Sequence, residues 1–168
     1  MKHGGFTLIE LVMVIVLIGI LAVYAAPKLG NITSTNSGAF TDKLRADIRY
    51  AQNLAMSQNR SYRIYFNTAP SSNPGYAVVN DANADGWGTT GANEYAQDPA
   101  RSGNLSIALN AGQYAGITFS AIGFSGNYVE FNSLGVPYDS LGALTVSKSV
   151  TVSPVGTVTV TAQTGAVN

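Results

Sequence analysis

Residues 6–27, FTLIELVMVIVLIGILAVYAAP, form an apolar stretch that contains a single carboxylate, Glu10. A short basic leader, MKHGG at residues 1–5, comes directly before this stretch. A helix rises about 1.5 Å per residue, so roughly 20 apolar residues cross a hydrocarbon layer about 30 Å thick. The length of the stretch therefore predicts a membrane-spanning helix. The positive charge of Lys2 predicts that the leader stays in the cytoplasm and that the chain after Pro27 lies outside it.

Glu10 is the unusual residue of this segment. An ionised side chain at membrane depth costs about 2.5–3.5 kcal/mol on insertion scales, so we expect it to have a partner. Cleavage between Gly5 and Phe6 would create a new α-amine about one helical turn from Glu10. An amine and a carboxylate attract strongly in a low dielectric, and each lowers the desolvation cost of the other. We predict that this pair forms between neighbouring staggered helices; the alternative is a plain signal anchor that tolerates Glu10.

The string GGFTLIELVMVIVLIGILAVYAAPKL, residues 4–29, resembles the N-terminus of type IV pilins and of the pseudopilins of type II secretion. The resemblance implies that a prepilin peptidase cuts after Gly5 and N-methylates Phe6. It also implies that Glu10 sets the register with an adjacent subunit, and that Gly19 and Pro27 loosen the helix in a filament. The residue types agree, because proline removes a helical hydrogen bond and glycine lowers helix propensity by about 1 kcal/mol.

The composition of the chain excludes several classes of chemistry. The chain has no cysteine, and its only histidine, His3, lies in the predicted leader. A Ser-His-Asp triad, a cysteine nucleophile and a zinc site built on histidine or cysteine are therefore excluded from the processed chain, and we predict no enzymatic activity. Beyond residue 61, three basic residues stand against six acidic ones, so the predicted head is net acidic. This charge disfavours broad binding of nucleic acid.

A second helix is predicted at about 38–58. Apolar residues recur there at steps of three and four, which is typical of one buried helix face. The polar stretch before it, GNITSTNSG at 30–38, fits either an irregular break or a weak helical continuation. Ser37 or Thr41 could cap the start of this helix, and Asn59 could end it. The predicted apolar stripe consists of Phe40, Leu44, Ile48, Ala51 and Ala55.

From Tyr62 onward the pattern is typical of short strands separated by Gly, Ser, Asn and Pro. The alternation in TVTVTA, residues 157–162, indicates a strand with one buried face. The segments predicted as strands are YRIYF, YAVV, LSIAL, YAGITF, NYVEF, ALTVS, VTVS and TVTVTA.

Three segments of the remaining chain resemble the minor pseudopilin GspH and the FimT pilins. They are FTDKLRADIRYAQNLAMSQNRSYRIYF at 40–66, YVEFNSLGVPYDS at 128–140 and TVTVTAQTGAV at 157–167. The second contains an F-x-x-x-G-x-P element, here Phe131, Gly135 and Pro137. DNA-binding FimT-type pilins carry a basic residue after the terminal glycine, whereas this chain has Ala166 after Gly165. This departure argues against a role in DNA uptake.

One segment has the composition of a cation site. Asp81, Asn83, Asp85 and Gly86 follow the D-x-N-x-D-G spacing of calcium loops, in which alternate oxygen side chains converge on one ion. The acid that usually closes such a loop would fall at Ala92, so Glu94 or Asp98 would have to replace it. The alternative is a surface loop rich in local hydrogen bonds. We predict no other cofactor, and calcium only as a structural ion.

These observations predict an α+β chain with the type IV pilin-like fold: a long N-terminal helix, transmembrane and then amphipathic, packed on an antiparallel β head. The expected parts are a leader at 1–5, the helix at 6–58 and the head at 59–168. The resemblance implies a structural and minor subunit of a pilus or secretion pseudopilus, with other pilins, prepilin peptidase and the membrane as partners. It would lie in the bacterial inner membrane and then in a periplasmic or extracellular filament. The alternatives are a binding, adhesion or DNA-uptake pilin at the filament tip, and a membrane-anchored enzyme.

Overall fold

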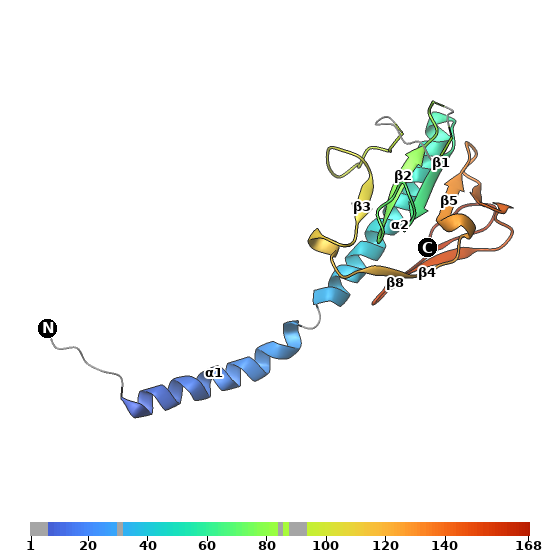
Figure 1. Cartoon of the computed structure of the whole chain (residues 1–168). Helices are drawn as coiled ribbons and strands as arrows, with labels where there is room; N and C mark the ends of the chain where they lie inside the picture. Colours follow the sequence, from blue (N-terminus) through green and yellow to red (C-terminus); the bar gives the residue numbers. More distant parts are fainter. Residues whose placement is uncertain (1–6, 30–31, 84–85, 88–93) are drawn as a thin grey trace.

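The computed structural model describes residues 7–29, 32–83, 86–87 and 94–168, with the backbone alone at 25–29 and 32–34. Two helices lead the chain, α1 at Leu8–Leu29 and α2 at Ile32–Gln58. Helix α1 extends away from the rest of the molecule, whereas α2 lies against the β-rich head, residues 59–168 (Figure 1). The arrangement is the predicted α+β fold. The head covers one side of α2 and does not cover α1 (Figure 1).

Two antiparallel sheets make up the head. The first has six strands in the order β3-β2-β1-β5-β6-β7, and the second has three in the order β4-β8-β9. Strand β1 lies between β2 and the much later β5, with Ile64 opposite both Val78 and Val129. The strands are β1 Tyr62–Phe66, β2 Gly75–Asn80, β3 Ser106–Ala108, β4 Thr118–Ile122, β5 Tyr128–Phe131, β6 Pro137–Asp139, β7 Gly142–Ala143, β8 Lys148–Ser153 and β9 Thr157–Val160; η1 Gly112–Tyr114 and η2 Ser125–Asn127 are short 3₁₀ turns.

The core lies between α2 and the sheets. Helix α2 contacts β1 and β5 of the first sheet and β8 and β9 of the second. The predicted stripe of α2 is confirmed, since every one of its members is buried. Phe40 packs against Tyr76 and Phe119, with ring centroids 5.9 Å apart in both pairs. One helix face therefore holds two sheets together.

The start of α2 differs from the predicted boundary. The helix begins at Ile32, so the described part of the polar stretch, residues 32–38, is helical. Ser37 and Thr41 do not cap it: the Ser37 hydroxyl donates to the carbonyl of Val155 at 2.6 Å and accepts from its N–H at 3.1 Å. Thr41 donates to the Ser37 carbonyl at 2.8 Å. These two residues attach α2 to the β8–β9 loop, and tertiary contacts therefore hold a polar sequence in helical form.

The end of α2 agrees with the sequence. The helix ends at Gln58, and Asn59 has a φ of 51°. The N–H of Arg60 donates to the carbonyl of Ala55 at 3.2 Å, which is the bond of a left-handed helix end. Asparagine tolerates this backbone region better than most residues because its short side chain can bond locally.

Two predicted strands are wrong in their bounds. In YAGITF, residues 114–119, Tyr114 still belongs to η1 and Gly116 has a φ of 87°, so extended structure begins only at Thr118. In ALTVS only Ala143 belongs to a strand, and β8 starts at Lys148. The chain has to leave the first sheet there in order to enter the second, which interrupts the extended run. The alternation predicted for TVTVTA is confirmed in β9, where Val158 and Val160 are buried.

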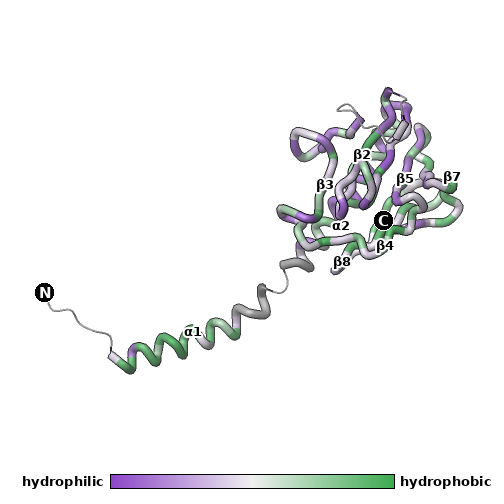
Figure 2. The backbone as a smooth tube through the Cα atoms, in the orientation of Figure 1, coloured by the Kyte–Doolittle hydropathy of each residue, from purple (hydrophilic) through white to green (hydrophobic). Residues whose placement is uncertain are grey.

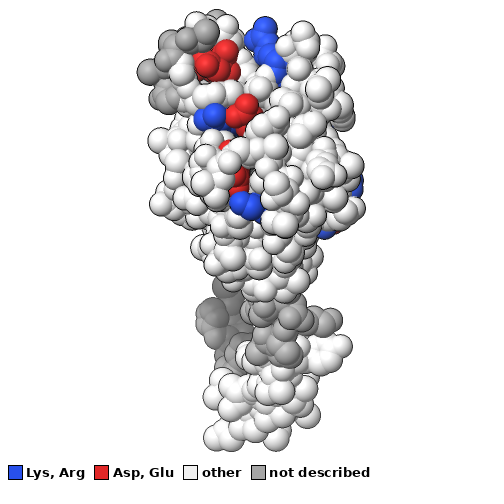
Figure 3. Space-filling view, turned by 90° about the vertical axis from the view of Figure 1, so that its right-hand side faces the viewer, with Lys and Arg blue, Asp and Glu red and all other residues white. Residues whose placement is uncertain are grey.

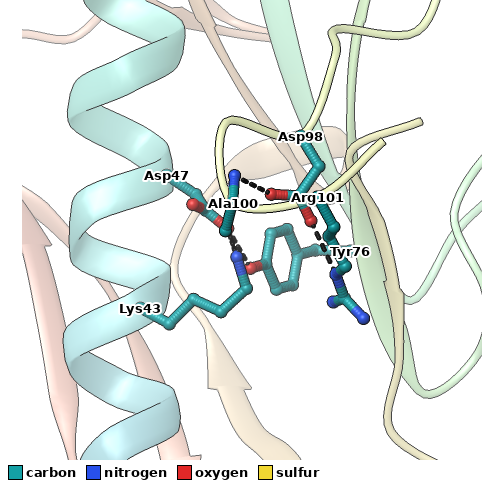
Figure 4. A network of polar contacts seen from close by, with 6 residues as sticks. All are labelled: Lys43, Asp47, Tyr76, Asp98, Ala100 and Arg101. Carbon is teal, nitrogen blue, oxygen red and sulfur yellow. Dashed lines mark hydrogen bonds and ion pairs between the residues drawn. The ribbon is translucent and has the colours of Figure 1, made fainter. Parts of the chain in front are cut away.

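A polar network joins α2 to β2 beneath the 98–101 loop (Figure 4). The hydroxyl of the buried Tyr76 donates to the Asp47 carboxylate, and Lys43 Nζ lies 2.9 Å from the same oxygen. Burial raises the pKa of Tyr76 well above its usual value, and the neighbouring Asp47 raises it further. Tyr76 therefore stays a neutral donor, so the buried carboxylate has both a hydrogen-bond donor and a counter-charge.

Candidate functional site

Helix α1 presents apolar side chains on every side. All of its described side chains, from Leu8 to Tyr24, are exposed. Among its large apolar residues the exposed fraction runs from 40% at Val12 to 81% at Leu8. Figure 2 shows the hydrophobic colour along most of the coloured part of α1, whereas the head mixes both kinds of residue. A helix that is apolar all round requires apolar surroundings, so this surface is the main candidate for the function of the chain.

No helix in the part of the chain that the structure describes is long and apolar enough to cross a membrane. The predicted membrane span is therefore not confirmed.

Glu10 lies in the first turn of α1, and its side chain is exposed. Its N–H donates to the hydroxyl of Thr7 at 3.3 Å and to the Thr7 carbonyl at 3.1 Å. Thr7 is therefore the N-cap, and Glu10 occupies the third helical position, as in the T-x-x-E capping box. A negative charge is also favourable at this end of the helix dipole. The Thr-x-x-Glu spacing in the sequence signals this helix start, in which the Thr7 hydroxyl is the capping group.

The other predicted assembly residues are placed by the structure only in part. Gly19 lies in the middle of α1 with no atom within 4 Å of the position that a Cβ would take. Helix α1 runs through Pro27 and ends at Leu29. The predicted processing residues Gly5 and Phe6 lie outside the described residues.

The predicted calcium ligands are only partly described. The Asp81 carboxylate accepts the N–H of Gly86 at 3.2 Å, and Asp85 lies outside the described residues. Asn83 is exposed, whereas Glu94 is only 2% exposed. Within the described ranges, no three acidic or histidine side chains lie close enough together to hold a metal ion. The Asp81 bond spans five residues, which is longer than an Asx turn, so it does not decide between the two readings and the calcium site stays a prediction.

The only tryptophan of the chain attaches the same loop to the sheet. The guanidinium of Arg63 on β1 lies 4.1 Å from the centre of the Trp87 ring and 4.2 Å from that of Tyr128. Arg63 also donates to Glu130 at 2.7 Å, so its charge is already paired. A cation between two aromatic faces stabilises their contact.

The three basic side chains beyond residue 61 are ion-paired within the chain. Besides the Arg63–Glu130 pair, Arg101 pairs with Asp98 at 2.9 Å, and Lys148 pairs with Asp139. Burial by itself would raise the pKa of Asp98, but the Ala100 N–H and the Arg101 guanidinium outweigh it and lower that pKa. The three basic residues beyond residue 61 are therefore all neutralised, which leaves little positive charge for phosphate contacts.

The two head elements that resemble the pseudopilin family meet at one residue of α2. The amide of Gln52 donates to the Gly135 carbonyl at 2.9 Å and to the Thr164 carbonyl at 3.0 Å. Gly165 has a φ of 67°, and a Cβ there would lie 2.6 Å from the Gly135 carbonyl oxygen. Gln52 was not predicted as a functional residue, since nothing in its position within the predicted helix distinguishes it. Ala166, which follows Gly165, is exposed.

Comparison with known proteins gives matches over most of the chain. The prokaryotic N-terminal methylation motif matches residues 1–26, and the family of the type II transport protein GspH matches residues 41–166. The chain is 43% identical over 58 residues to the type IV narrow pilus major component PilA5 of Thermus thermophilus, a match that covers 34% of this chain. The chain spans about half the length of that relative.

Among solved structures, the chain is similar to the type IV minor pilin FimU of Pseudomonas aeruginosa. One crystal form matches with 13% identity and a TM-score of 0.43, over 80% of this chain and 88% of FimU. A second crystal form matches with 14% identity and a TM-score of 0.42, over 78% and 90% of the two chains.

Proposed function

Because this chain belongs to the GspH family of type II transport proteins and carries the prokaryotic N-terminal methylation motif, we propose that it is a minor structural subunit of a type IV pilus or type II secretion pseudopilus. Its partners would be other pilin or pseudopilin subunits. The chain would serve as a building unit and not as an enzyme.

The observation that supports this proposal most directly is the exposure of α1. Each large apolar side chain left in water forgoes about 1.5–3 kcal/mol of burial energy, and α1 exposes such side chains along its described length. The head does not cover them, so another apolar medium has to. We propose that lipid of the inner membrane covers α1 before assembly, with the head outside the cytoplasm, and that α1 helices of neighbouring subunits cover it afterwards.

Processing precedes assembly in this proposal. Prepilin peptidase would cut between Gly5 and Phe6 and methylate the new N-terminus. Mass spectrometry of the native protein should therefore show a chain that begins at Phe6 with one added methyl group. A mature filament whose subunits still carry Met1 would contradict the proposal.

Glu10 has two candidate roles, as a helix-capping residue and as the acid that pairs with the N-terminus of a neighbour. Glutamine also serves in a capping box, so Glu10→Gln keeps the cap and removes the charge. Glu10→Ala removes both, and Thr7→Ala removes the cap while it keeps the charge. If pairing sets the register, both Glu10 variants insert into the membrane but fail to assemble, whereas Thr7→Ala still assembles.

The measurement is the amount of each variant in sheared filaments relative to its amount in membranes. If Glu10→Gln entered filaments as efficiently as the wild-type protein, charge pairing would be excluded as the mechanism. Loss of assembly in Thr7→Ala alone would assign Glu10 to capping. The three variants therefore separate the two roles of one residue.

A tip-located subunit that takes up DNA is the weaker alternative. The paired Arg63, Arg101 and Lys148 and the absence of a basic residue at Ala166 argue against it. In a gel-shift assay at about 0.15 M salt, the full chain in detergent should not retard a DNA duplex. Retardation that falls steeply with added salt would revive the alternative, because phosphate contacts release counterions.

Structural calcium in the 81–94 loop is a separate proposal, with Asp81, Asn83, Asp85 and Glu94 as ligands. Calcium that binds the folded state should raise the melting temperature progressively as its concentration rises. Titration of the full chain in detergent with millimolar Ca²⁺ tests this, with Mg²⁺ and Asp85→Asn as controls. An unchanged melting temperature in millimolar Ca²⁺ would contradict the proposal that this loop binds calcium.

A further inference from the structure

A small cavity lies where the end of α2 meets the first sheet. Its lining includes Tyr50 and Gln58 of α2, Tyr62 of β1, Asn80 of β2 and the later residue Tyr95. Helix α2 ends on the side of the head that faces away from α1 (Figure 1). The cavity has a volume of about 280 Å³, slightly below that of pockets for drug-sized ligands. Its size therefore suits one small ring.

Asn80 leaves a buried hydrogen-bond acceptor beside this cavity. The residue is only 4% exposed, and its Nδ2 donates to the carbonyl of Glu94 at 3.1 Å. Its Oδ1 accepts no hydrogen bond from any residue that the structure describes. A buried acceptor without a donor is unfavourable, because it has lost its bonds to water and gained none in return. A hydroxyl group of a ligand in the cavity would supply the missing donor.

Arg60 places a positive charge at the same cavity. Its side chain is exposed, and it forms no ion pair with an acid of the described ranges. Burial raises the pKa of Tyr62, and the nearby charge of Arg60 partly offsets this. Charged side chains are sparse on the face of the head that Figure 3 shows. The cavity lining contains no carboxylate among the described residues, so the site favours a ligand with an anionic group.

The remaining lining combines aromatic rings with amide groups. Tyr50 and Tyr95 are half-buried, so part of each ring is open to the cavity or to solvent. The Tyr62 hydroxyl donates to Gln58 Oε1 at 2.8 Å, which leaves the amide nitrogen of Gln58 to donate elsewhere. A sugar ring has hydroxyl groups at its edge and C–H groups on its faces. Tyrosine and amide side chains match both kinds of surface.

We infer that this cavity binds the terminal hexuronic acid ring of a saccharide. A ring hydroxyl would donate to Asn80 Oδ1, and the ring carboxylate would accept from the Arg60 guanidinium, which can bind it in a bidentate manner. A neutral sugar would leave Arg60 unused, and a simple carboxylate would leave Asn80 without a donor. The inference goes beyond the proposed function, because a structural subunit needs no ligand.

A water molecule is the simplest alternative occupant. Buried waters commonly satisfy polar groups that lack a protein partner, and one water could donate to Asn80 Oδ1. Water alone makes no use of the positive charge of Arg60. The two possibilities differ in one measurable respect, since a cavity that only holds water binds no sugar.

The test uses the full chain in a detergent without sugar head groups. The probe is methyl β-D-glucuronide, whose methyl group stands in for the rest of the saccharide. Methyl β-D-glucoside, which has a hydroxymethyl group in place of the carboxylate, is the matched neutral sugar. Saturation-transfer NMR titrations measure both affinities. At the ligand efficiency of ordinary small ligands, we expect a Kd of about 1 mM for the glucuronide and one about tenfold weaker for the glucoside.

Two variants separate the contributions of the charge and of the acceptor. Arg60→Gln should weaken the glucuronide about tenfold and leave the glucoside unchanged, since only the ion pair is lost. Asn80→Leu keeps the size of the side chain and should weaken both sugars about tenfold. Arg101→Gln removes an exposed arginine from another part of the head and is the matched control, with wild-type binding expected. Because Arg60 is exposed, Arg60→Gln should fold even if Asn80→Leu does not.

Three results would overturn the inference. They are no binding of the glucuronide at about 20 mM, where a Kd of about 1 mM gives near saturation, equal affinities of the wild type for the two sugars, and equal losses in Arg60→Gln and Arg101→Gln. Normal filaments in each of these cases would leave the proposed function standing. A chain that binds the glucuronide but never enters filaments would overturn the proposed function alone.

Discussion

Helices α1 and α2 are consecutive in the chain, yet they bury their apolar residues in different ways. Helix α2 gathers them on one stripe, which the head covers completely. Helix α1 distributes them around its circumference and leaves them exposed. The width of the apolar surface therefore indicates the partner: a narrow stripe matches a sheet of the same chain, whereas a fully apolar helix needs lipid or several neighbouring helices.

The largest expected effect contrasts one residue from each helix. Phe40→Ala should destabilise the head by about 3–5 kcal/mol, because Phe40 is fully buried between the two sheets. Leu17→Ala on α1 should change the stability of the head by no more than about 0.5 kcal/mol, because Leu17 is exposed. Thermal unfolding of the full chain in detergent, followed by circular dichroism, measures both. Equal changes in melting temperature for Phe40→Ala and Leu17→Ala would contradict the proposed difference between the two helices.

A smaller effect tests the attachment of the head to α2 through Gln52. Gly165→Ala should cost about 2–4 kcal/mol, since a left-handed backbone and contacts with Gln52 and the Gly135 carbonyl both oppose a Cβ. Gly112→Ala is the matched control: its φ is 71° but the surrounding space is open, so about 1–2 kcal/mol is expected. Chemical denaturation measures the difference, and equal losses would show that only backbone strain matters.

The stability of the head should depend on acid. The Lys148 ammonium and the N–H groups of Leu141 and Ser125 outweigh burial and lower the pKa of Asp139, as Arg101 and Ala100 do for Asp98. A folded-state pKa below the unfolded value adds stability above the unfolded pKa of about 3.9 and loses it as the pH falls through the folded value.

Denaturation from pH 7 to pH 2 should therefore show a steep loss of head stability below about pH 4. Asp139→Asn should flatten this loss while the helical signal of α1 in detergent stays unchanged. If the stability of Asp139→Asn fell with pH as steeply as that of the wild type, groups other than Asp139 would cause the acid sensitivity.

The smallest expected effect lies on the solvent side of α2. The Asp42–Arg45 pair is similar in kind to the Lys43–Asp47 pair, but the Asp42 side chain is 77% exposed and that of Asp47 only 5%. Asp42→Ala should change stability by no more than about 0.5 kcal/mol, as exposed ion pairs do. Asp47→Ala should cost clearly more, because it leaves the Tyr76 hydroxyl and Lys43 without their buried acceptor. Equal costs would mean that burial does not decide the strength of these pairs.

The parts of the fold that follow from local periodicity could be predicted. The stripe from Phe40 to Ala55, the helix end at Asn59 and the alternation of β9 each repeat along a few consecutive residues. The start of α2 could not be placed, because its polar first turns are held by a loop more than a hundred residues away. The bounds of β4 and β7 were wrong because glycine conformation and a change of sheet override strand propensity there.

The residues of the candidate site differ in the same way: a local sequence pattern reveals some of them, and only distant contacts reveal the others. Glu10 can be recognised from the sequence because it is the only charged residue in a long apolar stretch. This observation does not require the tertiary structure. Gln52 is not, since its importance depends on two carbonyls that the chain brings to it from residues 135 and 164. The calcium ligands remain a prediction from spacing, because Asp85 lies outside the described residues.

The sequence by itself determined that this chain has an apolar N-terminal helix with one acid, an amphipathic second helix and a β head, because hydrophobic period and turn residues act over short distances. Only the tertiary structure decided which strands share a sheet, that Gln52 joins two distant turns, and that Asn80 of β2 lies beside a cavity formed with the end of α2. Those features depend on pairings between residues far apart in the chain, and no local pattern encodes which distant partner a strand or a side chain will meet.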